Sequence, residues 1–243
     1  MLKSMLHRIL VLIISIGQFN HSNATEGMWV PSMINKLVGD EMQSMGMKVS
    51  ADDLYAINKS SIKDAVVHFN GGCTSVLVSG RGLLLTNHHC GYGRIQSHST
   101  LGTNYLEDGF WAGSLEEELV NPNMDATIIK EIRDVTNDVL KDMPMDATEV
   151  QRSAHISEQS EKIIAEVKEK TGYSAYIKPF YNGNQMLLFT LEVFKDIRLV
   201  GAPPSSIGKY GFDTDNWVWP RHTGDFSVFR IYANSDNKPA DYS

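Results

Sequence analysis

The sequence is poor in cysteine, in basic residues and in long apolar runs. Its 22 Lys and Arg residues are outnumbered by 29 Asp and Glu, which gives a net charge of −7. No positive field is therefore available for a phosphate backbone, and nucleic-acid binding is disfavoured. HExxH, paired CxxC and GxSxG motifs are absent, which removes the commonest zinc signatures and one nucleophile signature. The remaining composition, with 42% hydrophobic and 21% charged residues, is that of a folded globular protein.

The N-terminal apolar run covers only residues 9–16, whereas a helix needs about 20 apolar residues to cross a bilayer. The run follows Lys3 and Arg8 and precedes small residues that end at Ala24. This arrangement predicts a signal peptide over residues 1–24, cleaved after Ala24, and export to the periplasm or cell surface. No stable membrane span is expected, and an uncleaved amphipathic anchor is the alternative.

The two cysteines, Cys73 and Cys90, are 17 positions apart (90 − 73). Because an exported chain meets an oxidising environment, they predict one disulfide, which stabilises the fold by roughly 3 kcal/mol in the chain-entropy model. A metal site of Cys90 with His88 and His89 is the alternative. It is disfavoured because neighbouring residues on a strand point to opposite faces. Neither a metal nor an organic cofactor is expected.

Short apolar runs separated by glycine-rich turns predict a mainly β fold with helical additions. Residues 65–69, 74–78 and 83–86 form three such runs, a pattern typical of an antiparallel meander. Further strands are expected at residues 175–177, 186–194 and 226–232.

Two helical segments accompany these strands. Apolar residues at three- and four-residue spacing from Met33 to Met45 predict an amphipathic helix, with its methionines packed in the core. Residues 146–171 predict a helical insertion that begins with a capping box at residues 146–149 and ends at a glycine.

The residues suited to acid–base chemistry lie in two segments. His89 stands at the expected end of the 83–86 strand, directly before Cys90. A disulfide there would fix the backbone beside its ring, as a general base requires. His88 is expected on the other side of the strand, in a structural role. Asp225 follows a glycine and opens a strand, a position suited to a buried carboxylate that orients an imidazole.

These segments also resemble a known family over long motifs. Residues 86–92 (TNHHCGY) and 215–226 (DNWVWPRHTGDF) are similar to motifs of the dipeptidyl-peptidase family S46 of serine exopeptidases, and residues 27–29 and 108–112 fit that family too. The resemblance implies a chymotrypsin-like β-barrel, one half of a two-barrel serine peptidase. Residues 25–243 would then be the N-terminal part of its catalytic domain.

The same resemblance assigns roles to single residues. His89 matches the family's general base and Asp225 its orienting carboxylate, while Asn216 and Trp217 match residues that hold the free amino end of a peptide. An amide oxygen beside an aromatic wall suits that cation. The implied activity is the release of dipeptides from peptides with a free N-terminus, through an acyl-enzyme. A homodimer of the full-length protein is a further expectation.

One member of the expected catalytic triad is missing from these residues. No Gly-Asp-Ser occurs, and Ser97, Ser205 and Ser206 lie in no recognisable nucleophile turn. In the family the serine belongs to a second barrel, beyond a large helical domain. The chain is therefore interpreted as an N-terminal fragment without these parts, inactive by itself and expected to aggregate when expressed alone. The alternative is a catalytically inactive peptide-binding module or a truncated remnant.

Overall fold

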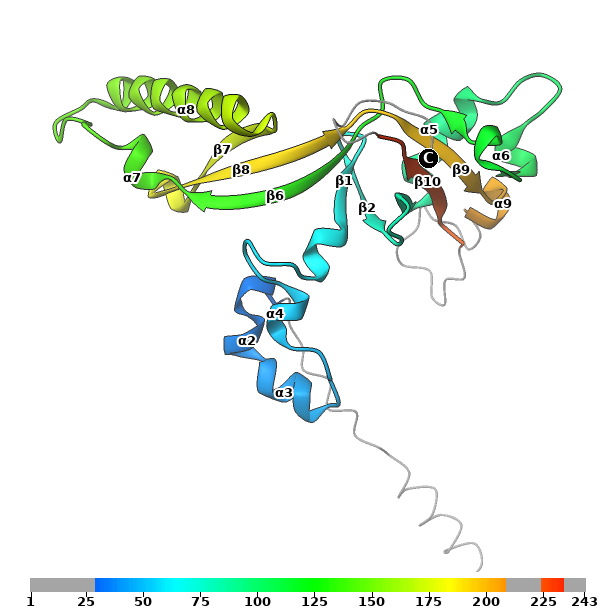
Figure 1. Cartoon of the computed structure of the whole chain (residues 1–243), viewed down its shortest axis with the longest axis horizontal. Coiled ribbons are helices and arrows are strands. Elements are labelled where there is room, and N and C mark those ends of the chain that lie inside the picture. Colours follow the sequence, from blue (N-terminus) through cyan, green and yellow to red (C-terminus); the bar gives the residue numbers. More distant parts are fainter. Residues whose placement is uncertain (1–28, 209–223, 234–243) are drawn as a thin grey trace, which may run out of the picture.

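The computed structural model describes residues 29–208 and 224–233, and its strands join into one antiparallel sheet (Figure 1). Nine of the ten strands follow the order β4-β9-β10-β3-β2-β1-β6-β8-β7, and the tenth, β5, pairs with β9 outside this path. The strands are β1 (Val66–Phe69), β2 (Cys73–Leu77), β3 (Leu83–Thr86), β4 (Phe110–Trp111), β5 (Leu119–Val120), β6 (Ala126–Asp134), β7 (Ser174–Phe180), β8 (Gln185–Phe194), β9 (Ile197–Ala202) and β10 (Ser227–Ile231).

The helices are short except for α5 and α8, and within the described ranges none is long and apolar enough to cross a membrane. The α-helices are α2 (Ile34–Leu37), α3 (Gly39–Ser44), α4 (Ala51–Leu54), α5 (His88–Ser97), α6 (Tyr105–Asp108), α7 (Thr136–Val139), α8 (Glu149–Thr171) and α9 (Ser205–Gly208). The 3-10 turns are η1 (Pro31–Met33), η2 (Ile62–Ala65), η3 (Leu115–Glu117) and η4 (Tyr181–Gly183).

The predicted meander is confirmed as β1, β2 and β3. Val76 on β2 lies opposite Val66 on β1 and opposite Leu85 on β3. The predicted last strand is confirmed as β10, which lies between β3 and β9, with Phe229 opposite Leu84 on β3. A segment near the end of the chain thus completes the sheet beside a segment near its beginning.

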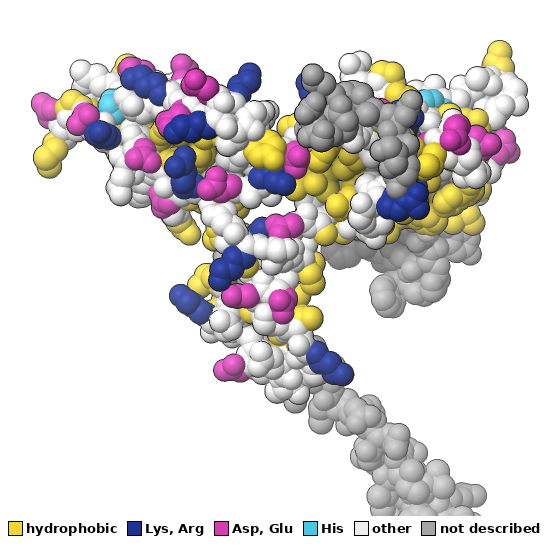
Figure 2. All heavy atoms as spheres, in the orientation of Figure 1, with side chains coloured by type: hydrophobic (Ala, Val, Ile, Leu, Met, Phe, Trp, Pro, Cys, Tyr) yellow, Lys and Arg dark blue, Asp and Glu magenta, His cyan; other side chains and the backbone are white. Residues whose placement is uncertain are grey.

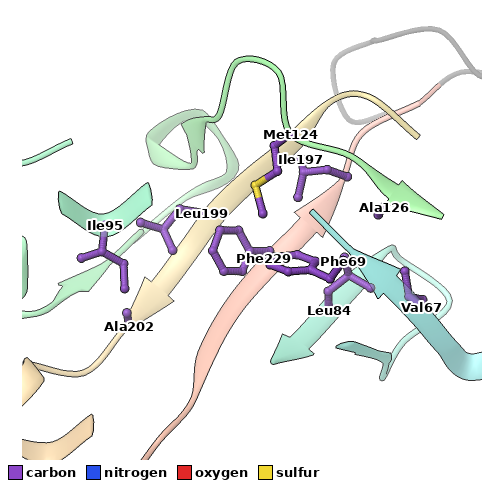
Figure 3. Packing of buried hydrophobic residues seen from close by; sticks show 10 residues of the cluster. All are labelled: Val67, Phe69, Leu84, Ile95, Met124, Ala126, Ile197, Leu199, Ala202 and Phe229. Atoms are coloured by element: carbon purple, nitrogen blue, oxygen red, sulfur yellow. The ribbon is translucent and has the colours of Figure 1, made fainter. Parts of the chain in front are cut away.

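The main hydrophobic core lies where the inner faces of these strands meet α5 (Figure 3). Alternate residues of each strand point inward because the side-chain period of a strand is two. Phe69 and Phe229 meet edge to face with ring centroids 4.9 Å apart, a favoured aromatic geometry. Each fully buried side chain of this size contributes about 1.5–3 kcal/mol. The cluster consists of Val67, Phe69, Leu84, Ile95, Met124, Ala126, Ile197, Leu199, Ala202 and Phe229.

Strands β6, β8 and β7 extend away from this core as an arm that carries α8 (Figure 1). The predicted helical insertion is confirmed as α8, and its outer face carries acidic and basic side chains side by side (Figure 2). The inner face packs on the strands together with α7. The small core of the arm consists of Val135, Val139, Val167, Met186 and Leu188.

The predicted cap of α8 is wrong by two residues. The capping box joins Thr148 and Gln151, because the Gln151 side chain accepts the Thr148 backbone N–H at 2.9 Å. Residues 146–149 were expected to form it, but Ala147 is held in a turn by the carbonyl of Pro144. The helix ends as predicted, at Gly172, whose φ of 73° lies in the left-handed region.

The amphipathic helix predicted from Met33 to Met45 is also wrong. The segment is divided into η1, α2 and α3, and Val38, at the junction of α2 and α3, has a non-helical φ of −141°. Met33 and Met45 are exposed, so they do not fill a core as expected. Local spacing alone therefore overstated both the length of the helix and its burial.

Two of the longer strands escaped prediction. In β6 a register shift between Ile129 and Glu131 interrupts the alternation of burial, and in β9 buried Ile197 and Leu199 are followed by two small buried residues. The mainly β fold class with added helices is confirmed. The strand order of the described residues is a linear path, and closure into a chymotrypsin-like barrel remains a prediction.

Candidate active site

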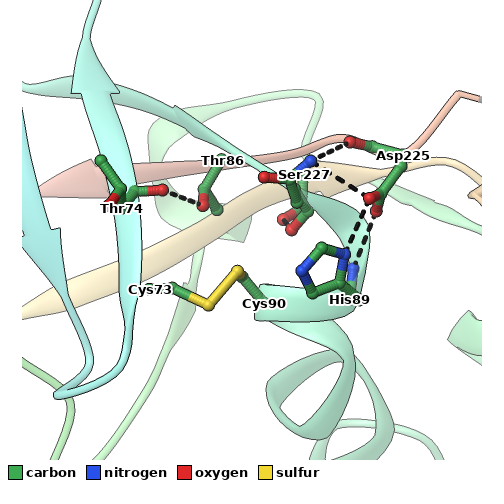
Figure 4. The surroundings of a disulfide bond; sticks show 8 residues. Cys73, Thr74, Thr86, His89, Cys90, Asp225 and Ser227 are labelled. Carbon is green, nitrogen blue, oxygen red and sulfur yellow. Dashed lines mark hydrogen bonds and ion pairs between the residues drawn. A yellow bond between two sulfur atoms is a disulfide. The ribbon is translucent and has the colours of Figure 1, made fainter. Parts of the chain in front are cut away.

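The site is built where the β2–β3 hairpin returns to the start of α5. Cys73 opens β2 and Cys90 lies in the first turn of α5, and their sulfurs are bonded at 2.02 Å. The predicted disulfide is thus confirmed. It ties the hairpin to the helix directly beside His89 (Figure 4).

The two histidines lie on a helix and not at a strand end, which corrects the sequence-based expectation. Strand β3 ends at Thr86, Asn87 occupies the N-cap position, and α5 begins at His88. Successive helical residues are separated by about 100° around the axis. His88 is therefore buried, 1% exposed, while the His89 side chain is 59% exposed. The expected division into one buried and one accessible histidine still holds, because the two residues face different sides of α5.

Asp225, two residues before the start of β10, holds His89 through both of its carboxylate oxygens. Nδ1 of His89 lies 2.7 Å from Oδ2, and the backbone N–H of His89 donates to Oδ1 at 3.0 Å. The side-chain amide of Asn87 donates to Oδ2 at 3.1 Å and to the Asp225 carbonyl oxygen at 3.2 Å. The structure thus brings together the two residues that the sequence assigned as base and carboxylate (Figure 4).

Strand pairing explains why Asp225 reaches α5. Ser227, the first residue of β10, lies opposite Thr86, the last residue of β3. Its hydroxyl donates to the carbonyl oxygen of Asn87 at 2.9 Å. Asp225, two positions before Ser227, is therefore placed at the N-terminus of α5, where backbone N–H groups favour a carboxylate.

The electrostatics of the pair fix the tautomer of the imidazole. Burial alone raises the pKa of the Asp225 carboxyl. The hydrogen bonds from the backbone and ring of His89, the charge of His89 and the amide of Asn87 together outweigh burial, and the pKa is lowered below its ordinary value. An ionised carboxylate can only accept hydrogen bonds, so Nδ1 carries a proton, and in the neutral imidazole the lone pair is on Nε2.

Asn87 is the residue of this site that sequence reasoning missed. An Asn before a helix is normally an N-cap whose side chain accepts from the helix. Here its side chain makes no cap hydrogen bond, and Asp225 accepts the N–H of His89 in its place. The only sequence signal was the position of Asn87 between a strand and two histidines.

A shallow apolar groove runs from the site along the outer face of the meander. It is lined by Val66, Val76 and Leu85 from the three strands and by Phe226 next to Asp225. Asn216 and Trp217, the predicted amino-end binders, lie outside the described residues, as do residues 1–24. Ser97, rejected as a nucleophile, donates its hydroxyl to the carbonyl of Arg94 within its own helix.

A solvent-accessible histidine with its Nδ1 held by a carboxylate is the arrangement of base and orienting group in serine peptidases. Comparison with known proteins points to the same class. The family model Peptidase S46 matches residues 24–243, and the chain belongs to that family.

Individual relatives agree with this assignment. The chain is 55% identical over 217 residues to an "Asp/Glu-specific dipeptidyl-peptidase" of Capnocytophaga gingivalis, covering 89% of this chain and 30% of that protein. It is 44% identical over 228 residues to "Dipeptidyl-peptidase 7" of Porphyromonas gingivalis, covering 94% and 32%.

Among solved structures, that of Porphyromonas endodontalis DPP11 in complex with substrate matches with a TM-score of 0.75 and 52% identity, over 90% of this chain and 33% of that one. The mainly antiparallel fold therefore corresponds to part of a DPP11 molecule. The chain spans about 30% of the length of the curated relatives it matches.

Proposed function

We propose that this chain is the N-terminal part of an exported serine dipeptidyl-peptidase and supplies the general base and its orienting carboxylate. The observation that carries the proposal is the 2.7 Å contact between Nδ1 of His89 and Asp225. It leaves Nε2 as the proton acceptor, as in acyl-transfer enzymes of the serine type. The nucleophilic serine is proposed to come from a part of the longer protein outside these residues.

In the proposed reaction, Nε2 of His89 accepts the proton of the serine hydroxyl as the serine oxygen bonds to the carbonyl carbon of the scissile peptide. The same proton then passes to the leaving amine when the C–N bond breaks, and an acyl-enzyme remains. A water molecule then attacks the acyl-enzyme while Nε2 of His89 accepts its proton, and the return of this proton to the serine oxygen frees the dipeptide. Asp225 stays ionised and stabilises the imidazolium that forms in each half.

An enzyme that cuts after the second residue of a peptide must bind the free amino end of that peptide, and this requirement defines the substrate class. We propose that Asn216 and Trp217 bind the substrate's ammonium group, as an amide oxygen and an aromatic face can. Four relatives named Asp/Glu-specific are 48–55% identical to this chain, and four named dipeptidyl-peptidase 7 are 44–46% identical. This difference supports a preference for an acidic residue at the second position of the substrate.

The test uses the full-length protein and dipeptidyl substrates with Asp, Glu or an apolar residue at the second position. The wild-type enzyme should release dipeptides only from free amino ends, fastest after the acidic residues. His89→Ala should lower kcat by a factor of about 10⁴. His155→Ala, which removes a half-buried histidine of the arm, should not change the rate. A wild-type rate in His89→Ala rejects the proposal, and peptide binding without release supports an inactive binding module.

A further inference from the structure

The outer face of the sheet, opposite the main core, carries a row of apolar residues that crosses six strands. Each member lies directly opposite the next in the register of the paired strands, and opposite residues project from the same face. Neighbouring strands are about 4.8 Å apart, so the row is about 24 Å long. This outer row consists, from β4 to β1, of Trp111, Gly201, Val228, Leu85, Val76 and Val66.

Four members of the outer row are exposed, although the solvated face of an antiparallel sheet normally carries polar residues. Trp111 is 58% exposed, Val66 51%, and Val76 and Leu85 38% each. Single apolar residues on a surface are common, but a contiguous group of them marks a surface that binds something. The outer row is therefore suited to contact with another apolar surface.

One end of the outer row is fixed by a close aromatic contact. The ring of Trp111 lies on Gly201, where a Cβ would come within 2.3 Å of a ring atom, so any larger residue would displace the ring. The same ring lies beside Phe226, with ring centroids 6.1 Å apart. Phe226 follows Asp225 in the chain, and both line the groove that contains three members of the outer row. The outer row therefore borders the candidate active site.

We propose that the outer row is covered by the part of the longer protein that carries the nucleophilic serine. The inference rests on the proposed function, which requires such a part. A serine can give its proton to Nε2 of His89 only from hydrogen-bond distance, so the chain that carries it must contact the surface beside this histidine. That surface includes the groove at Asp225. Because the chain spans about 30% of the length of its curated relatives, a protein of their length has enough further residues to form a covering layer.

Two other occupants fit the outer row less well. A bound peptide gains affinity from main-chain hydrogen bonds at the edge of a sheet. The face of a sheet presents side chains only, because its backbone groups already pair with the neighbouring strands. A second copy of this chain would bring another base and carboxylate to the surface beside His89, and not the nucleophile that the proposed reaction needs there. A layer of the same polypeptide supplies both the apolar contact and the serine.

Thiol labelling of the full-length protein tests the inference without any need for turnover. Val76→Cys introduces a thiol in the outer row, and Cys73 and Cys90 do not compete for the reagent because they are bonded to each other. A maleimide should label position 76 about 100-fold more slowly than Val150→Cys, because a covered thiol reacts only after local opening. Val150, on α8, is the matched control and is 80% exposed. Mass spectrometry of the labelled peptides measures both rates.

Three labelling results would overturn the inference. Equal rates for the two variants would show that the outer row is open to solvent. Slow labelling of Val76→Cys only when a peptide substrate is bound would assign the row to the substrate. Slow labelling that depends on protein concentration would assign it to a second copy.

Hydroxyl-radical footprinting of the wild-type protein covers the case in which Val76→Cys does not fold. Relative to their rates in the unfolded protein, Trp111 should be protected about tenfold more than Tyr181, which is exposed on the arm. Equal protection of the two residues rejects the inference. Neither readout depends on the activity of His89→Ala, so a failure of this inference is distinguishable from a failure of the proposed function.

Discussion

Asp225 contacts His89 at two points, its ring Nδ1 at 2.7 Å and its backbone N–H at 3.0 Å. One carboxylate thereby sets both the orientation of the imidazole and the position of the helix that carries it. The amide of Asn87 approaches the same oxygen as Nδ1 does, so that oxygen must accept two hydrogen bonds. Because all of these contacts need an acceptor, a side chain that contains a hydrogen-bond donor cannot replace the carboxylate.

The first prediction concerns Asp225→Asn in the full-length protein. An amide cannot accept from the backbone of His89 and also accept from Nδ1 and Asn87, so its NH₂ group faces Nδ1 and forces the proton onto Nε2. We expect kcat to fall by about 10⁴ while folding is retained. Steady-state kinetics measure this loss, and Asp138→Asn on α7 is the matched control. A loss of less than tenfold would contradict the assigned role.

The second prediction concerns the packing of α5 on β10. A Cβ at Gly91 would lie 2.7 Å from Oγ of Ser227 and 3.2 Å from the Phe229 ring, so the helix would have to move. Gly91→Ala should destabilise the protein by about 1–3 kcal/mol and lower kcat, because His89 moves with the helix.

Gly93, on the same helix, is the matched control for this substitution. Among the described residues nothing lies within 4 Å of a Cβ at this position, and alanine is a better helix former by about 1 kcal/mol. Gly93→Ala should therefore raise the thermal midpoint slightly and leave kcat unchanged. Equal effects of the two variants in thermal unfolding and kinetics would refute the described contact.

The third prediction concerns pH and the buried ionic cluster at the far end of β10. Glu118 accepts from Arg230 at 3.0 Å and from the Tyr232 hydroxyl at 2.7 Å. Burial, followed by the hydrogen bond to Glu118, raises the pKa of Tyr232 to about 12. An unfolded tyrosine titrates near pH 10. The stabilisation from the neutral hydroxyl is thus complete below about pH 10 and is lost as the pH rises toward 12.

Absorbance at 295 nm checks this prediction, because ionised tyrosine absorbs there. The difference between the titration curves of wild type and Tyr232→Phe should show one group titrating near pH 12. Tyr181→Phe, which removes an exposed tyrosine, is the matched control and should leave the group that titrates near pH 12 in place. A curve for Tyr232 centred at pH 10 would show that the described hydrogen bond is not formed.

The fourth prediction concerns processing. If residues 1–24 are a signal peptide, protein recovered from the cell envelope or medium should begin at Thr25, because the enzyme that removes such peptides requires small residues before the cut. Mass spectrometry of the N-terminal peptide identifies this end. Ala24→Leu should leave the precursor uncut, and Ala24→Gly should not. A wild-type protein that keeps Met1 would contradict export by this route.

Part of the fold could be predicted because its signals are local. Alternating apolar residues and glycine turns defined β1 to β3, and the expected export of a chain with two cysteines indicated the bond between Cys73 and Cys90. Helix α5 could not be predicted in this way. Its first turns contain Gly91 and Gly93, which are poor helix formers, and it follows the leucine-rich strand β3 with only Asn87 between them. Packing on Phe229 and the contacts from Asp225 favour the helix, and neither is visible locally.

The candidate site was predictable for a different reason. His89 and Asp225 stand in long motifs, and their residue types fit the chemistry of a base and a carboxylate. Their meeting depends on a register between β3 and β10 that no local pattern specifies. For Asn87 the position was visible but the partner was not, since an N-cap residue normally bonds its own helix.

The position of β10 has a consequence for how activity arises during folding. This strand fills the space between β3 and β9 and is the last of the described strands in the chain, so the sheet stays divided until it arrives. Asp225, which orients the candidate base, lies two residues before the start of this strand. A chain whose sheet is incomplete therefore has a histidine without its orienting carboxylate, and under the proposed function such a nascent or partly unfolded molecule would be inert toward peptides. Proteolytic competence and completion of the fold would appear in the same event.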